Sequence, residues 1–112
     1  MNSVQLIGRL TRDPEYRISQ NGAETKEITR FTLAVDRGGN NADFISCVAF
    51  GRHANFINKY FSKGSKMELT GNLRTGSYND KDGKKVYTTD VIVDEQEFAE
   101  SKNASGGGSA YS

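Results

Sequence analysis

The most informative part of this 112-residue chain is the run Asp43-Phe44-Ile45-Ser46-Cys47-Val48-Ala49-Phe50-Gly51. The run predicts a β-strand, in which alternate side chains share a face. One face carries Ile45, Cys47 and Ala49, which are small and apolar and suit the interior of a barrel. The other face carries Phe44 and Phe50, whose rings lie roughly 20 Å apart at about 3.3 Å per residue.

Widely spaced rings on an outer face have two interpretations. They can be packing contacts, in the core or between subunits, and this strand alone favours that interpretation. They can also form a surface on which successive nucleobases stack, because every base has a π-face. The rest of the chain shifts the balance toward the second interpretation.

The remaining sequence predicts a small, mostly β domain. Asp13-Pro14-Glu15 ends the first strand, because proline cannot donate a hydrogen bond to a sheet, and Asn21-Gly22 is a strong turn signal. Loops are expected at residues 37–41 and 79–83. Besides residues 43–51, four strands are expected from their alternation or their β-branched residues, at residues 4–10, 28–36, 67–73 and 86–93.

Alternation also assigns the two faces of these strands. The inner faces of the second and fourth strands are expected to carry their apolar side chains: Phe31, Leu33, Val35, Met67, Leu69 and Leu73. Arg74 and Tyr78 share the opposite parity. They are therefore expected on the outer face of the fourth strand and its extension.

One segment after the third strand changes its period. Five of its residues follow the i, i+3, i+4 spacing of an amphipathic helix: His53, Phe56, Ile57, Tyr60 and Phe61. Gly64 predicts the helix stop. Three strands, a helix and two strands is the order of the OB-fold, whereas an SH3-like barrel lacks this helix. We expect an all-β, five-stranded OB-fold barrel with one short helix between strands 3 and 4.

Charge is unevenly distributed, although the net charge is only +1. Residues 1–89 hold 14 Lys and Arg against 9 Asp and Glu, whereas residues 90–112 hold one Lys and five acids. A mildly basic body permits a polyanion partner without requiring one. Residues 99–112 contain almost nothing apolar, so they predict a disordered tail after an OB-fold domain at residues 1–98.

The expected cellular setting is the reducing cytoplasm. The only cysteine, Cys47, can form no internal disulfide and is expected as buried filler. No apolar run approaches the length of a membrane span, and the N-terminus lacks the pattern of a signal peptide.

Catalysis is not expected. His53 is the only histidine and begins the helix, where a partly buried or capping role is expected. The sequence contains no Walker loop and no cluster with metal-ligand spacing, so we expect no catalytic residue, no cofactor and no metal. A magnesium-dependent nuclease is the strongest enzymatic alternative. It needs converging carboxylates, whereas the acids here are scattered among loops and ends.

Six short fragments of the chain form a recognisable series: Gly8-Arg9-Leu10-Thr11-Arg12-Asp13-Pro14-Glu15, Phe31-Thr32-Leu33-Ala34-Val35, Asp43-Phe44 leading to Phe50-Gly51, Lys63-Gly64-Ser65, Gly71-Asn72-Leu73-Arg74-Thr75 and Tyr87-Thr88-Thr89-Asp90-Val91. In this order and spacing they resemble the bacterial single-stranded DNA-binding proteins over about residues 1–98. The resemblance implies a homotetramer with an OB-fold. Such tetramers wrap single-stranded DNA in replication, repair and recombination, near the nucleoid in the cytoplasm.

The resemblance also implies site residues. The stacking aromatics of the family fall on Phe44, Phe50 and Tyr78, and Tyr60 matches a further aromatic often near DNA. Candidate phosphate contacts are basic side chains that would release counterions from the strand: Arg9, Arg52, Lys63 and Arg74. The hairpin loop at residues 79–83, with its flanking lysines, is expected to be a mobile flap that touches DNA.

The chain departs from the family pattern in three places. The loop at residues 37–41 carries no aromatic ring, although the family often has one there. Ser46, Gly76 and Ser77 replace residues that are basic in some members. The family usually ends in an acidic tip closing with Pro-Phe, whereas this chain ends Ser109-Ala110-Tyr111-Ser112, so recruitment of replication and repair enzymes through such a tip is not expected.

Two non-enzymatic alternatives remain open. One is an OB-fold module that binds protein as well as DNA, like the primosomal proteins related to this family, and it would show fewer exposed rings. The other is an RNA-binding OB domain of the cold-shock kind. That kind is shorter and has clustered aromatic motifs that are not found here.

Overall fold

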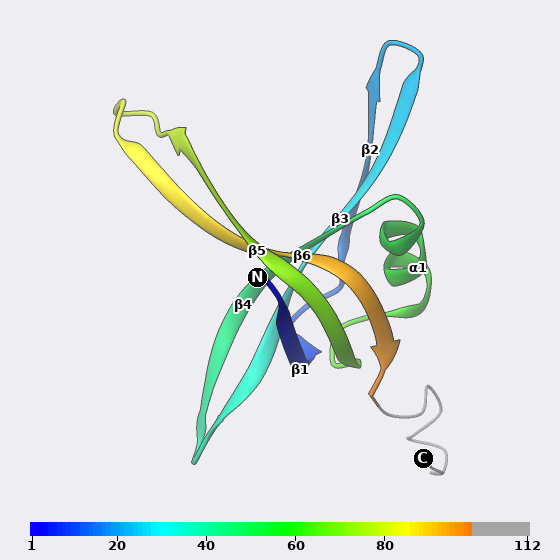
Figure 1. Ribbon diagram of the computed structural model, residues 1–112, viewed down its shortest axis with the longest axis vertical. Coiled ribbons are helices and arrows are strands. Elements are labelled where there is room, and N and C mark those ends of the chain that lie inside the picture. Colours follow the sequence, from blue (N-terminus) through cyan, green and yellow to red (C-terminus); the bar gives the residue numbers. More distant parts are fainter. Residues whose placement is uncertain (100–112) are drawn as a thin grey trace.

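The computed structural model describes residues 1–99, and the expected tail and acidic-tip position lie outside the described residues except for Ala99. Six strands and one helix follow one another (Figure 1). Their bounds are β1 Val4–Leu10, β2 Glu15–Asn21, β3 Glu24–Gly38, β4 Asn41–Phe50, α1 Arg52–Tyr60, β5 Lys66–Asn79 and β6 Lys85–Phe98. The five strands expected from the sequence are all present, and the domain boundary at residue 98 stays a prediction.

Five of the strands form a closed ring. Pairing runs in the order β1, β5, β6, β4, β3, and β1 also pairs with β3. All these pairs are antiparallel except β4 with β6, where Val48 lies opposite Ile92 in a parallel pair. The helix connects the third and fourth strands of the ring along the chain. This topology confirms the expected OB-fold.

Strand β2 is the one element that the sequence analysis missed. It pairs with the first half of β3 from Glu15 opposite Arg30 to Asn21 opposite Glu24, and Gly22 turns the chain with a φ of 69°. The resulting hairpin projects beyond the ring (Figure 1). Most of its side chains are exposed, so no inner face imposes an apolar alternation on its sequence.

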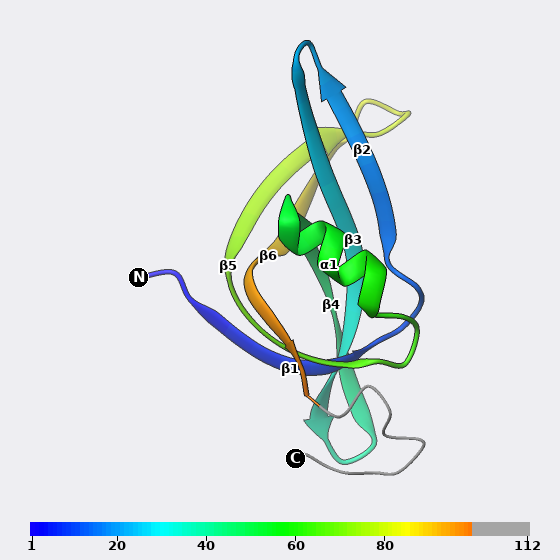
Figure 2. The ribbon, with the colours of Figure 1, turned by 90° about the vertical axis from the view of Figure 1, so that its right-hand side faces the viewer.

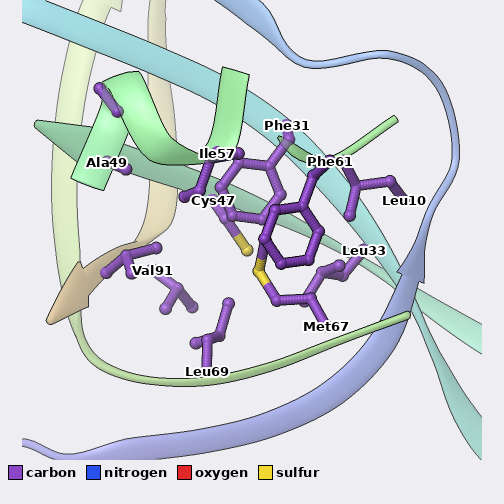
Figure 3. Close-up of a cluster of buried hydrophobic side chains, with 12 residues drawn as sticks. Leu10, Phe31, Leu33, Cys47, Ala49, Ile57, Phe61, Met67, Leu69 and Val91 are labelled. Carbon is purple, nitrogen blue, oxygen red and sulfur yellow. The ribbon is translucent and has the colours of Figure 1, made fainter. Parts of the chain in front are cut away.

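The core fills the ring beneath the helix (Figure 3). Its members come from every element except β2: Leu10, Phe31, Leu33, Cys47, Ala49, Ala54, Ile57, Phe61, Met67, Leu69, Val91 and Val93. Cys47 and Ala49 are fully buried, as the alternation of residues 43–51 predicts. Val48 is also buried, although it belongs to the outer face and not to this cluster, because Arg30 and Ile92 lie opposite it on the two neighbouring strands.

The helix covers the ring from one side (Figure 2). Its buried side chains are Ala54 and Ile57, and the buried hydroxyl of Thr29 donates to the carbonyl of Ala54 at 2.9 Å. The helix ends at Tyr60. The next residue, Phe61, has an extended backbone conformation, and its side chain is part of the core. The prediction that Gly64 stops the helix is therefore wrong. Gly64 lies in the following turn, with a φ of 88°, and its amide donates to Leu10.

The inward assignment of Leu73 is also wrong. Strand β5 pairs with β1 only as far as Gly71 opposite Val4, and beyond that point it pairs with β6 alone. The side chain of Leu73 is 46% exposed because it lies where the hairpin of β5 and β6 leaves the ring. Whether this position is buried depends on how far the β5–β6 hairpin extends beyond the ring, and the alternation of residues along β5 does not give that length.

Candidate nucleic-acid interface

Strand pairing places three of the expected aromatic residues on one face of the sheet. Phe44 and Phe50 share the outer face of β4 with Ser46, whose hydroxyl donates to Asp90 on β6 at 2.8 Å. Asp90 and Val86 have the same parity on β6, and they lie opposite Arg74 and Tyr78 on β5. We call this surface, which carries Phe44, Phe50, Arg74 and Tyr78, the aromatic face.

The rings of the aromatic face are accessible. Phe44 is 70% exposed, Tyr78 is 57% exposed and Phe50 is 37% exposed. On the neighbouring strand β3, Phe44 lies opposite the small side chain of Ala34, whereas Phe50 lies opposite Ile28. Exposed rings on a sheet surface are what base stacking requires, since each ring must present a flat side to the ligand.

Tyr60 lies on a different surface. It is on helix α1, with its ring centroid 4.8 Å from that of Phe56, and Lys59 approaches its ring. Both rings are somewhat over one-third exposed. The sheet pairing therefore does not bring Tyr60 together with Phe44, Phe50 and Tyr78.

The predicted basic residues divide between the sheet and its edges. Arg74 lies on the aromatic face, and the residue opposite it, Asp90, already accepts from Ser46. Arg52 begins α1 and lines a hollow on the helix side together with His53, Phe56, Glu95 and Gln96. Lys63 follows the helix, and its amide donates to Asp13 at 2.8 Å.

Arg9 is the remaining predicted cation. It lies on β1 opposite Ala34, which in turn lies opposite Phe44. Its Nη1 donates to the carbonyl of Gly64 at 2.8 Å, so part of its guanidinium holds the turn after the helix. This leaves Arg9 two strands away from the first ring of the aromatic face, with β3 between them.

Sequence reasoning missed two arginines, Arg12 and Arg30. Arg30 lies on the outer face of β3 opposite Val48, which lies between Phe44 and Phe50 on the neighbouring strand. Arg12 and Arg30 line one hollow of about 190 Å³ with Ser46. The signal for Arg30 was available, because the alternation that points Phe31 and Leu33 inward points Arg30 outward. Arg12 carried no such signal, since it follows the end of β1.

Contacts between nearby residues close the two loops expected at residues 79–83 and 37–41. The hairpin turn after β5 closes on Asp80, whose Oδ1 accepts the amides of Asp82 and Lys84, both at 2.9 Å. The expected loop at residues 37–41 is shorter in the structure, because β3 and β4 extend into it, and Arg37 forms an ion pair with Asp43 across it. Neither loop carries an aromatic side chain.

Among residues 1–99, no three His, Cys, Asp or Glu side chains gather as a metal site would require. His53 is partly buried, as expected, and its Nδ1 lies 2.9 Å from Oε1 of Gln96. Burial raises the pKa of the Cys47 thiol to about 12, with a further contribution from Asp90, so this thiol is not a nucleophile at neutral pH. Within the described part of the chain, no helix has the length and apolarity needed to cross a membrane.

Comparison with known proteins agrees with this geometry. Residues 1–99 match the single-strand binding protein family. A single-stranded DNA-binding protein of Clostridium perfringens is 48% identical over 112 residues, covering 98% of this chain and 73% of the relative. One from Fusobacterium nucleatum is 48% identical, covering 95% of this chain and 71% of the relative. Single-stranded DNA-binding protein 1 of Staphylococcus aureus is 44% identical over 93% of this chain and 64% of its own length. The chain, with its OB-fold and its exposed aromatic face, belongs to the single-strand binding protein family.

Proposed function

We propose that this protein binds single-stranded DNA without sequence preference and without catalysing a reaction, in replication, repair and recombination. The observation that carries the proposal is the placement of three exposed rings, Phe44, Phe50 and Tyr78, on one sheet face. Stacking tolerates every base, because it uses the π-face and not the hydrogen-bonding edge. We further propose that this work is done in the cytoplasm, near the nucleoid.

Basic side chains would hold the DNA backbone beside the stacked bases. Arg74 is the best placed of the predicted cations, because it shares the aromatic face with Tyr78. Arg9 and Lys63 would contact the strand near the turn after the helix, and Arg52 would contact it beyond Phe50. Tyr60 would serve only DNA that continues over helix α1.

The protein is further proposed to assemble as a homotetramer, as the family implies. Apolar side chains outside the aromatic face support this, since an assembly would cover them. Ile7 on β1 is 50% exposed, and Leu73 on the hairpin of β5 and β6 is 46% exposed. Single exposed apolar residues are common on monomers, so the mass in solution is the deciding measurement.

The direct test is titration of labelled oligo-dT against a duplex of equal length, with light scattering to record mass. Preference for the single strand by a particle of four chains is expected. Equal binding of duplex would refute single-strand binding, and a monomer would refute only the tetramer. Incubation of labelled DNA with the protein and magnesium tests the nuclease alternative, which sustained cleavage by pure protein would support.

A further inference from the structure

A hollow lined mostly by polar residues lies beside β4, between Phe44 and Phe50. Its volume is about 190 Å³, and its walls come from four parts of the chain. The chain after β1 contributes Arg12 and Asp13, β2 contributes Glu15, β3 contributes Arg30, Phe31 and Thr32, and β4 contributes Ser46. Strands β2, β3 and β4 are neighbours in the sheet, in that order.

The pairing register fixes where this hollow lies along the aromatic face. Arg30 is opposite Val48 and Thr32 is opposite Ser46, so the hollow adjoins β4 between its two exposed rings. A strand whose bases stack on Phe44 and Phe50 must carry its backbone across the intervening surface. The connecting phosphates therefore pass close to this hollow.

The charges in the hollow suit a phosphate. Within residues 1–99, the guanidinium groups of Arg12 and Arg30 form no ion pair and no side-chain hydrogen bond. A guanidinium presents a planar set of N–H donors that matches two phosphate oxygens. The hydroxyl of Ser46 is committed to Asp90, which leaves Thr32 as the hydroxyl on this wall that can donate to a ligand.

Two carboxylates share the hollow, and they decide its strength. Asp13 is engaged, because its Oδ1 accepts the amide of Lys63 at 2.8 Å. Glu15 lies opposite Arg30 across the pair of β2 and β3, and it is exposed. A carboxylate directly opposite Arg30 would compete with a phosphate for that guanidinium.

We propose that Arg30, assisted by Arg12, forms a phosphodiester-binding subsite between the two stacking positions, and that Glu15 tunes its affinity. This inference rests on the proposed function and adds a location for the backbone. It assigns the phosphate contact to the outer face of β3, where the sequence analysis placed no site residue.

The test is the salt dependence of oligo-dT binding. For single strands, log K against log of the salt concentration has a slope of about −0.7 for each phosphate neutralised. Arg30→Ala should make the slope shallower by about 0.7, and Arg30→Lys should keep it, since the charge remains. Glu15→Gln should strengthen binding at every salt concentration tested. Lys26→Ala is the matched control, because Lys26 is exposed on the same face of β3 but beyond Ile28 and outside the two rings.

An unchanged slope in folded Arg30→Ala, checked by circular dichroism, would overturn the subsite. An equal change in Lys26→Ala would also overturn it, because the effect would then belong to cations in general. The proposed function has a separate readout, since it fails when the unmodified protein does not prefer oligo-dT to duplex. The subsite fails alone when the unmodified protein binds oligo-dT and Arg30→Ala binds with the same slope.

Discussion

Truncation of Phe44 separates stacking from stability better than any other change on the aromatic face. The side chain is 70% exposed and faces Ala34, so its removal deletes little packing. Phe44→Ala should therefore change the free energy of unfolding by no more than about 0.5 kcal/mol, as for most surface substitutions. A change in DNA affinity can then be attributed to the lost contact with DNA.

The expected loss of affinity follows from the energy of one stacked base. Base–aromatic stacking contributes about 1–3 kcal/mol, which corresponds to roughly 5- to 160-fold in Kd. Phe50→Ala should cause a loss of the same order, with a larger effect on stability, because Phe50 is only 37% exposed and faces Ile28. The two rings are roughly 20 Å apart along the strand, so their effects on affinity should add.

Oligo-dT titration by fluorescence anisotropy measures these losses, and Tyr87→Ala is the matched control. Tyr87 is 76% exposed, but it lies opposite Ser77 and therefore on the other face of the hairpin from Tyr78. Its truncation should leave Kd unchanged. The reasoning is refuted if the folded double variant of Phe44 and Phe50 binds like the parent, or if Tyr87→Ala weakens binding as much as Phe44→Ala.

Two further predictions concern stability. A Cβ on Gly71 would lie 2.1 Å from the backbone oxygen of Ile92, so Gly71→Ala should lower the free energy of unfolding in urea by about 1–3 kcal/mol or more. On the same strand, a Cβ on Gly76 would meet only the side chain of Thr88, at 3.2 Å, so Gly76→Ala should change the free energy of unfolding by less than about 0.5 kcal/mol. Equal losses of stability in the two glycine variants would contradict this reasoning. The raised pKa of Cys47, about 12, stabilises the fold below the pKa of the unfolded thiol, roughly 8.5. The free energy of unfolding should therefore decrease as pH rises from roughly 8.5 toward about 12, by up to about 1.4 kcal/mol per pH unit. Urea titrations over this pH range should show a smaller decrease for Cys47→Ala, which has no thiol to ionise.

The order of the five ring strands and the helix along the chain, and the two faces of β4, were predictable from the sequence by itself. Burial on one side of a strand imposes a period of two on its residues, and burial on one side of a helix imposes the i, i+3, i+4 spacing. This alternation predicts that Cys47 and Ala49 lie inside the ring and that Phe44 and Phe50 lie outside it. The order of five strands and one helix then identified the OB-fold.

Only the tertiary structure decided what lies beside what. The sequence of strand β2 shows no alternation of apolar residues, because its hairpin lies outside the ring. Leu73 is exposed because β5 extends beyond the last residue that pairs with β1. Arg12 and Arg30 are 18 positions apart in the sequence, and they meet at one hollow through the β2–β3 and β3–β4 pairing. Local periodicity reports which side of a strand is buried, whereas strand register and ring closure are non-local, and they determine which outward side chains become neighbours.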